Sequence, residues 1–138
     1  YDVMGRMYRE NYLGMIADWC RAHSVRFVGH LHMEDNLPHH VRVEGDIFKG
    51  TGMFHLAGVD RIDLNTNKVA EKYASSVQHA YGLERTLAET FALTRWGLRP
   101  QDLRKGTNWQ YVRGINMIVP HAFYADRVGL TDAVLARF

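Results

Sequence analysis

The chain has 138 residues, the length of a single domain. Lys and Arg number 17 against 15 Asp and Glu, and the resulting net charge of +2 gives no electrostatic support for a nucleic-acid or anionic-membrane partner. Apolar residues make up 46% and charged residues 23%, values typical of a globular protein with a packed core rather than a disordered or fibrous chain. No apolar stretch approaches the roughly 18 residues of a membrane span.

Four short runs rich in β-branched and aromatic residues predict β-strands. They cover residues 25–31, 58–64, 85–91 and 115–120. These strands begin 33, 27 and 30 residues apart, which is the length of a βα unit. Such spacing favours parallel strands covered by helices.

The spacing of apolar residues between the strands predicts helices. The predicted helices cover 7–23, 65–81 and 100–114, and 38–56 is expected to be a long loop with at most a short helical piece. Gly82 is expected to end the second helix as a C-cap, and Pro100 to begin the third. Met15, Ile16 and Trp19 share one face of the first helix and are expected to pack in the core.

Two architectures use this alternation, an open doubly wound sheet and a (β/α)₈ barrel. A doubly wound sheet normally carries a glycine-rich phosphate-binding turn, and neither G-x-G-x-x-G nor G-x-x-x-x-G-K-[ST] occurs. The predicted fold is therefore α/β, with four βα units that form half of a (β/α)₈ TIM barrel, since a full barrel needs about 250 residues. We expect 1–138 to be one partial barrel domain, and a chain that begins at Tyr1 within a predicted helix to be a fragment of a larger hydrolase.

Polar side chains gather where the predicted strands end. The first strand is followed by His30, His32, Glu34 and Asp35, the third contains Glu89, and His121 and Tyr124 follow the fourth. The carboxyl ends of barrel strands meet at one edge, where active sites are built. Glycoside hydrolysis needs two carboxylates that flank the scissile bond, and Glu34 and Glu89 are the best placed.

Several sequence blocks resemble successive blocks of bacterial TIM-barrel glycoside hydrolases. The blocks are 29–37 (GHLHMEDNL), 88–91 (AETF), 96–97 (WG), 109–116 (WQYVRGIN) and 120–124 (PHAFY). They are most similar to α-L-rhamnosidases and their uncharacterised relatives, whose catalytic domain is a (β/α)₈ barrel, and they correspond to the C-terminal half of that barrel. The resemblance runs in order over most of the chain, from about residue 6 to residue 125.

This resemblance implies a segment of a catalytic barrel that hydrolyses glycosidic bonds of a carbohydrate substrate in the parent enzyme. It implies that Glu89 is a catalytic or substrate-binding carboxylate and that Glu34 is the other acidic residue of the site. His30 and His121 are expected to line the sugar pocket. Further expected sugar contacts are His32, Asp35, Trp96 and Tyr124, and no cofactor is implied.

Each assignment has a structural alternative. Glu34 is alternatively a solvated loop acid or a helix N-cap, and Glu89 is alternatively the partner of Arg85 or Arg95 in a structural ion pair. The densest histidine cluster consists of His30, His32, His39 and His40. It lacks the H-E-x-x-H or cysteine-pair spacing of a zinc site, so no metal is predicted.

A non-enzymatic alternative applies to the whole chain, either a self-associating half-barrel or a sugar-binding α/β module. Four parallel strands leave two edges unpaired, and a barrel would close them. We therefore expect a homo-oligomer formed through sheet edges or exposed apolar helices.

Overall fold

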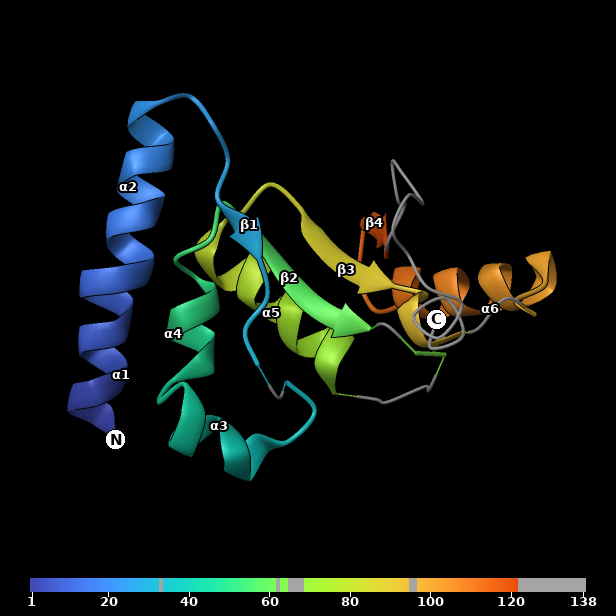
Figure 1. Cartoon of the computed structure of the whole chain (residues 1–138), viewed down its shortest axis with the longest axis horizontal. Coiled ribbons are helices and arrows are strands. Elements are labelled where there is room, and N and C mark those ends of the chain that lie inside the picture. Colours follow the sequence, from blue (N-terminus) through green and yellow to red (C-terminus); the bar gives the residue numbers. More distant parts are fainter. Residues whose placement is uncertain (33, 62, 65–68, 95–96, 122–138) are drawn as a thin grey trace, which may run out of the picture.

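A computed structural model of the chain describes residues 1–32, 34–61, 63–64, 69–94 and 97–121. Its centre is a curved four-stranded sheet (Figure 1). The strands are β1 (Val28–Gly29), β2 (Leu56–Arg61), β3 (Thr86–Thr90) and β4 (Met117–Pro120), in the order β1-β2-β3-β4. Every neighbouring pair is parallel, which confirms the predicted α/β class. The sheet curls into the shape of a half-barrel.

Helices fill the segments between the strands. They are α1 (Asp2–Tyr8), a π-helical segment (Arg9–Gly14), α2 (Met15–Ala22), α3 (Leu37–Val43), α4 (Ile47–Thr51), α5 (Ala70–Tyr81), a 3₁₀ turn (Ala92–Thr94) and α6 (Pro100–Tyr111). The α1, π-helical and α2 segments form one continuous helix that begins earlier than predicted (Figure 1). Gly82 ends α5 with a φ of 65°, as the C-cap prediction requires.

The stretch predicted as a long loop contains two short helices. Asn36 begins α3 by accepting a hydrogen bond from the His39 backbone N–H at 3.1 Å. Asp46 begins α4 in the same way, through the Lys49 backbone N–H at 3.1 Å. Side-chain caps of this kind compensate for the unsatisfied N–H groups of a helix start. Helices of seven and five residues are too short to produce the apolar periodicity on which the sequence prediction relied.

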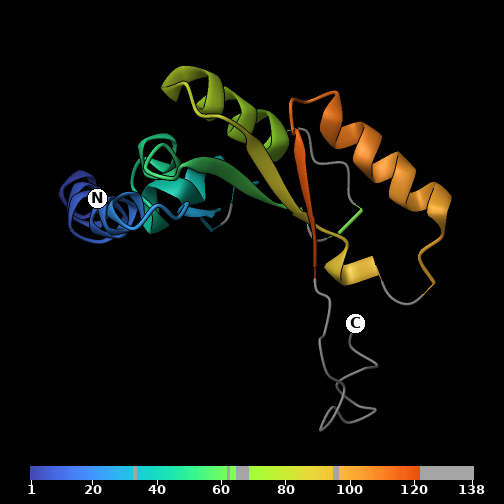
Figure 2. The same cartoon turned by 90° about the horizontal axis from the view of Figure 1, so that it is seen from above.

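The core lies between the sheet and α5. Ala57 and Val59 of β2 and Ala88 of β3 are fully buried against Ala74 and Val77 of α5. Figure 2 shows that α5 and α6 lie along the same side of the sheet, whereas the N-terminal helix and α3 and α4 gather at the β1 end. Because successive side chains of a strand point to opposite faces, every second residue faces the helix layer and the others face the opposite side of the sheet.

The apolar face predicted for the first helix is not buried. Met15 and Trp19 are 64% and 59% exposed, because the helix turns Leu13, Ala17 and Cys20 toward the rest of the molecule instead. The prediction that Met15 and Trp19 pack in the core is wrong for the described part of the chain.

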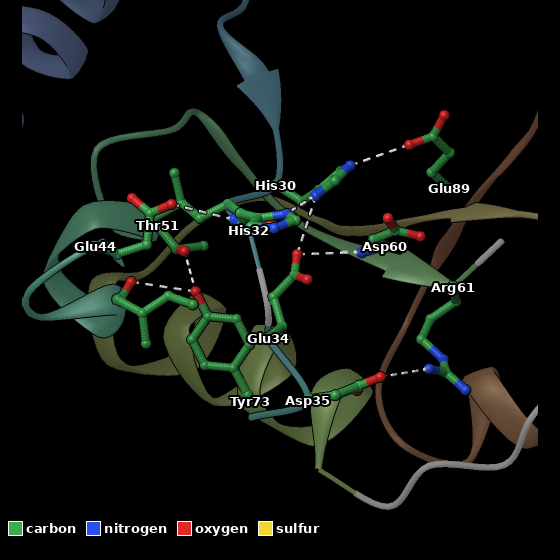
Figure 3. A network of polar contacts seen from close by, with 12 residues as sticks. His30, His32, Glu34, Asp35, Glu44, Thr51, Asp60, Arg61, Tyr73 and Glu89 are labelled. Carbon is green, nitrogen blue, oxygen red and sulfur yellow. Dashed lines mark hydrogen bonds and ion pairs between the residues drawn. The ribbon is translucent and has the colours of Figure 1, made fainter. Parts of the chain in front are cut away.

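A buried hydroxyl pair joins α4 to α5. The Tyr73 hydroxyl contacts the Thr51 hydroxyl and donates to the Ile47 carbonyl oxygen at 3.2 Å. Tyr73 is 8% exposed, and burial raises the pKa of its phenol well above the usual value. This contact holds α4 against α5 (Figure 3).

No helix in the described residues is long and apolar enough to cross a membrane.

Candidate active site

His30 lies between the two predicted catalytic carboxylates. Its Nδ1 is 3.1 Å from Glu34 Oε1, and its Nε2 is 3.0 Å from Glu89 Oε2 (Figure 3). Nδ1 is also 2.8 Å from the Leu31 carbonyl oxygen. His30 directly follows β1, and Glu89 belongs to β3, so the contact joins two strands that are not neighbours in the sheet. One imidazole therefore links residues that are 59 positions apart in the sequence.

These contacts keep His30 protonated at neutral pH. The interaction of the protonated ring with the Glu34 carboxylate is the largest influence and raises the pKa of His30 to about 9, with further contributions from the Leu31 carbonyl and Glu89. Partial burial opposes the shift but does not cancel it. With both ring nitrogens protonated, Nε2–H donates to Glu89 and Nδ1–H donates to the Leu31 carbonyl, while the Nδ1 side of the imidazolium forms an ion pair with Glu34.

Glu34 is buried and is held at a fixed position. It is 4% exposed, and its Oε1 accepts a hydrogen bond from the Asp60 backbone N–H at 3.3 Å. It also lines a cavity of about 200 Å³, together with His32, Asp35, Asn36, Asp60, Arg61 and Asp63. This environment is not that of a solvated loop acid, and the N-cap of the following helix α3 is Asn36 instead.

Glu89 is the more accessible carboxylate. Its side chain is 31% exposed, and its Oε1 is 3.5 Å from Nε2 of His121. In the register of the sheet Glu89 lies opposite Asp60, which places the two residues on the same face of neighbouring strands. The predicted structural pair with Arg85 is not formed, because Arg85 lies against Glu84 at 3.9 Å. Arg95, the other predicted partner, lies outside the described residues.

The remaining predicted residues have different positions. His32 is exposed and lines the cavity beside Glu34, and its backbone N–H donates to Glu44 Oε1 at 3.3 Å. Trp96 and Tyr124 lie outside the part of the chain that the structure describes. The structure thus brings His30, Glu34, Glu89 and His121 together, and their chemical roles remain predictions.

A buried ion-pair network beside the cavity was not anticipated from the sequence. Arg61 is 4% exposed, and its guanidinium lies 3.3 Å from Asp35 Oδ2, 3.6 Å from Asp63 Oδ1 and 3.0 Å from Glu71 Oε1. Asp35, predicted to contact sugar, is therefore tied to the end of β2. One signal was available: Arg61 follows Ala57 and Val59 on the helix-facing side of β2, where a charge requires a partner.

The Glu44 side chain is buried and hydrogen-bonded, although Glu44 lies in the stretch that was predicted to be a loop. It is 7% exposed, ends α3 and accepts the hydrogen bond from the His32 backbone. A substitution at Glu44 is therefore unsuitable as an inert control for the site.

Within the described residues, no group of three or more His, Cys, Asp and Glu side chains is arranged to hold a metal ion.

The comparisons with known proteins support the fold. No family model and no curated protein sequence matches the chain. Among solved structures, the chain is similar to the structure of a rhamnosidase from Novosphingobium sp. PP1Y, with a TM-score of 0.72 and 22% sequence identity over 86% of the chain. The chain spans 12% of the length of that enzyme. At this identity the similarity shows the fold alone.

Proposed function

We propose that this chain is half of a (β/α)₈ barrel whose parent enzyme hydrolyses glycosidic bonds with Glu34 and Glu89 as the paired carboxylates. The observation that carries the proposal is the position of His30 between these two carboxylates, at the carboxyl ends of β1 and β3. Barrel enzymes bind substrate at this edge of the sheet. The fold similarity to a rhamnosidase supports a carbohydrate as the substrate class.

The spacing of the two carboxylates favours an inverting mechanism. The His30 imidazole and two contacts of 3.1 and 3.0 Å separate Glu34 Oε1 from Glu89 Oε2. Inverting enzymes hold their carboxyl groups about 6.5–9.5 Å apart to leave room for a water molecule, whereas retaining enzymes hold them about 5–5.5 Å apart. While the imidazole lies between the two carboxyl groups, they cannot approach each other to the spacing of a retaining enzyme.

The proposed reaction balances as an acid–base displacement. One carboxylic acid donates its proton to the glycosidic oxygen as the bond from that oxygen to the anomeric carbon breaks. The other carboxylate accepts a proton from a water molecule whose oxygen forms the new bond to the anomeric carbon. His30 is a positioning residue in this scheme, since its imidazolium holds both carboxylates in place.

Turnover by the full-length protein tests the proposal. Wild type is expected to release the aryl group from at least one member of an aryl-glycoside panel that includes a rhamnoside. Glu89→Gln keeps the shape of the side chain and is expected to lower turnover about 10²–10⁴-fold. Glu84→Gln is the matched control, because Glu84 is exposed and forms ion pairs with the exposed Arg26 and Arg85, and it should leave turnover unchanged. Full activity in Glu89→Gln removes Glu89 from the mechanism.

The second candidate is a module that binds sugar without cleaving it. The observation that favours it is the same imidazole, which lies between the two carboxylates and contacts both of them. In that case the full-length protein binds a glycoside saturably and never releases the aryl group, and Glu89→Gln changes only the affinity.

A further inference from the structure

A second polar cavity lies on the helix-covered side of the sheet, away from Glu89. It has a volume of about 90 Å³ and is lined by Arg61, Glu71, Lys105, Trp109 and Gln110 among others, and we call it the α5–α6 cavity. One water molecule needs roughly 10–15 Å³ of such volume. The α5–α6 cavity therefore has room for a ligand of a few non-hydrogen atoms.

Two buried oxygen atoms of residues that line this cavity have no hydrogen-bond partner within the described part of the chain. Glu71 is 1% exposed, and both of its polar contacts, from Arg61 Nε at 3.0 Å and from Trp109 Nε1 at 3.2 Å, are made by Oε1. Its Oε2 is buried without a partner, and so is Oε1 of Gln110, a residue that is 4% exposed. Buried polar atoms are almost always satisfied in native proteins, by protein, by water or by a ligand.

The chemistry of these two oxygen atoms determines which kind of ligand the α5–α6 cavity can bind. Both are acceptors, so the missing partner must offer at least two N–H or O–H donors. One acceptor belongs to a carboxylate, and a hydrogen bond from a cation to a carboxylate is roughly twice as strong as a neutral one.

We propose that the α5–α6 cavity binds the ammonium group of a small primary amine, with Glu71 Oε2 and Gln110 Oε1 as its acceptors. A primary ammonium carries three donors on one compact charged atom, so it can satisfy both oxygens at once. This site shares Arg61 and Asp63 with the cavity beside Glu34, but its two acceptors, Glu71 and Gln110, line only the α5–α6 cavity, and amine binding does not depend on glycosidase activity.

The test uses methylammonium as the probe and the Trp109 indole as the reporter. In the full chain, titration with methylammonium chloride is expected to shift the Trp109 indole N–H resonance saturably, with the resonance assigned by Trp109→Phe. Tetramethylammonium has the same charge and no N–H donor, so it should produce no saturable shift. Methanol, which offers a single donor and no charge, should also fail.

A pair of glutamine variants on α6 makes the test specific. Gln110→Leu removes one acceptor and leaves the Glu71–Arg61 pair intact, so it should fold and weaken methylammonium binding about tenfold or more. Gln101→Leu, at an exposed position of the same helix, should bind like wild type. The proposal is overturned if the shift does not saturate in wild type, which indicates that water alone fills the cavity, or if Gln110→Leu binds as tightly as wild type. Equal binding of methanol overturns the assignment of a cation.

Discussion

The His30 imidazole reaches the Glu89 carboxylate across an intervening strand, with 3.0 Å between Nε2 and Oε2. Gly29 lies opposite Ala57 in the β1–β2 register, so Gly58 is the next residue of β2 beside His30. A Cβ at Gly58 would lie only 2.1 Å from the Gly29 carbonyl oxygen and 2.9 Å from Leu87 Cδ1. The missing side chain therefore allows β1 to approach β2 closely enough for His30 to reach β3.

Replacement of this glycine is expected to damage both the sheet and the site. Gly58→Ala forces backbone atoms apart and should lower the free energy of unfolding by about 1–3 kcal/mol or more, the range for overpacked positions. Gly97→Ala is the control, because no atom lies within 4 Å of a Cβ there. Urea unfolding of the two variants measures the difference. Equal stability of both variants would show that β1 adjusts without cost.

The raised pKa of His30 makes stability depend on pH. The unfolded side chain titrates near pH 6.5 and the folded one near pH 9, so the folded state binds more protons between these values. The stabilising contribution of His30 is present in full below about pH 6.5 and is lost as the pH rises through about 9. The total is on the order of 3 kcal/mol.

Urea unfolding at pH 6 and pH 9.5 measures this dependence. His30→Gln is expected to be less stable than wild type at pH 6 and to lose less stability between the two pH values. His79→Gln, at an exposed position on α5, should keep the wild-type dependence. A wild-type pH dependence in His30→Gln would assign the proton uptake to another group.

The buried hydroxyl of Tyr73 is expected to stabilise the packing of α4 against α5. Tyr73→Phe removes the contact with Thr51 and the hydrogen bond to the Ile47 carbonyl, which should cost about 1–3 kcal/mol of unfolding free energy. Tyr81→Phe on the same helix, where the tyrosine is 46% exposed, should cost little. Thermal or urea unfolding of the pair compares the two hydroxyl groups directly.

Self-association of the chain remains a prediction, and the exposed helix face makes it specific. Met15 and Trp19 present apolar surface to solvent, and contiguous patches of this kind often mark interfaces. Light scattering is expected to give a dimer or a larger oligomer for wild type. The double variant Met15→Lys with Trp19→Lys should shift toward monomer if the helix forms the interface, and should remain associated if sheet edges do. A stable wild-type monomer at high dilution contradicts both.

The sequence predicted best those features whose position depends on a single strand or turn. Runs of β-branched residues located β2, β3 and β4 to within a few residues, and the rule that parallel strands end at one edge brought His30, Glu34 and Glu89 together. Contacts between the sheet and the helices packed on it were harder to predict from the sequence. The Arg61–Glu71 pair depends on which faces of β2 and α5 meet, and periodicity alone does not specify that. The buried side of the first helix was assigned wrongly because its apolar residues occupy more than one face.

The strand order has a consequence for how the site assembles. Within the residues that the structure describes, each strand pairs with the strands next to it in the chain, so the sheet is able to grow one unit at a time from either end. The His30–Glu89 contact skips β2, and it therefore forms only once both β1 and β3 have paired with β2. A folding experiment that monitors the His30–Glu89 contact itself would thus record the stage at which three strands have come together, rather than the formation of any single helix.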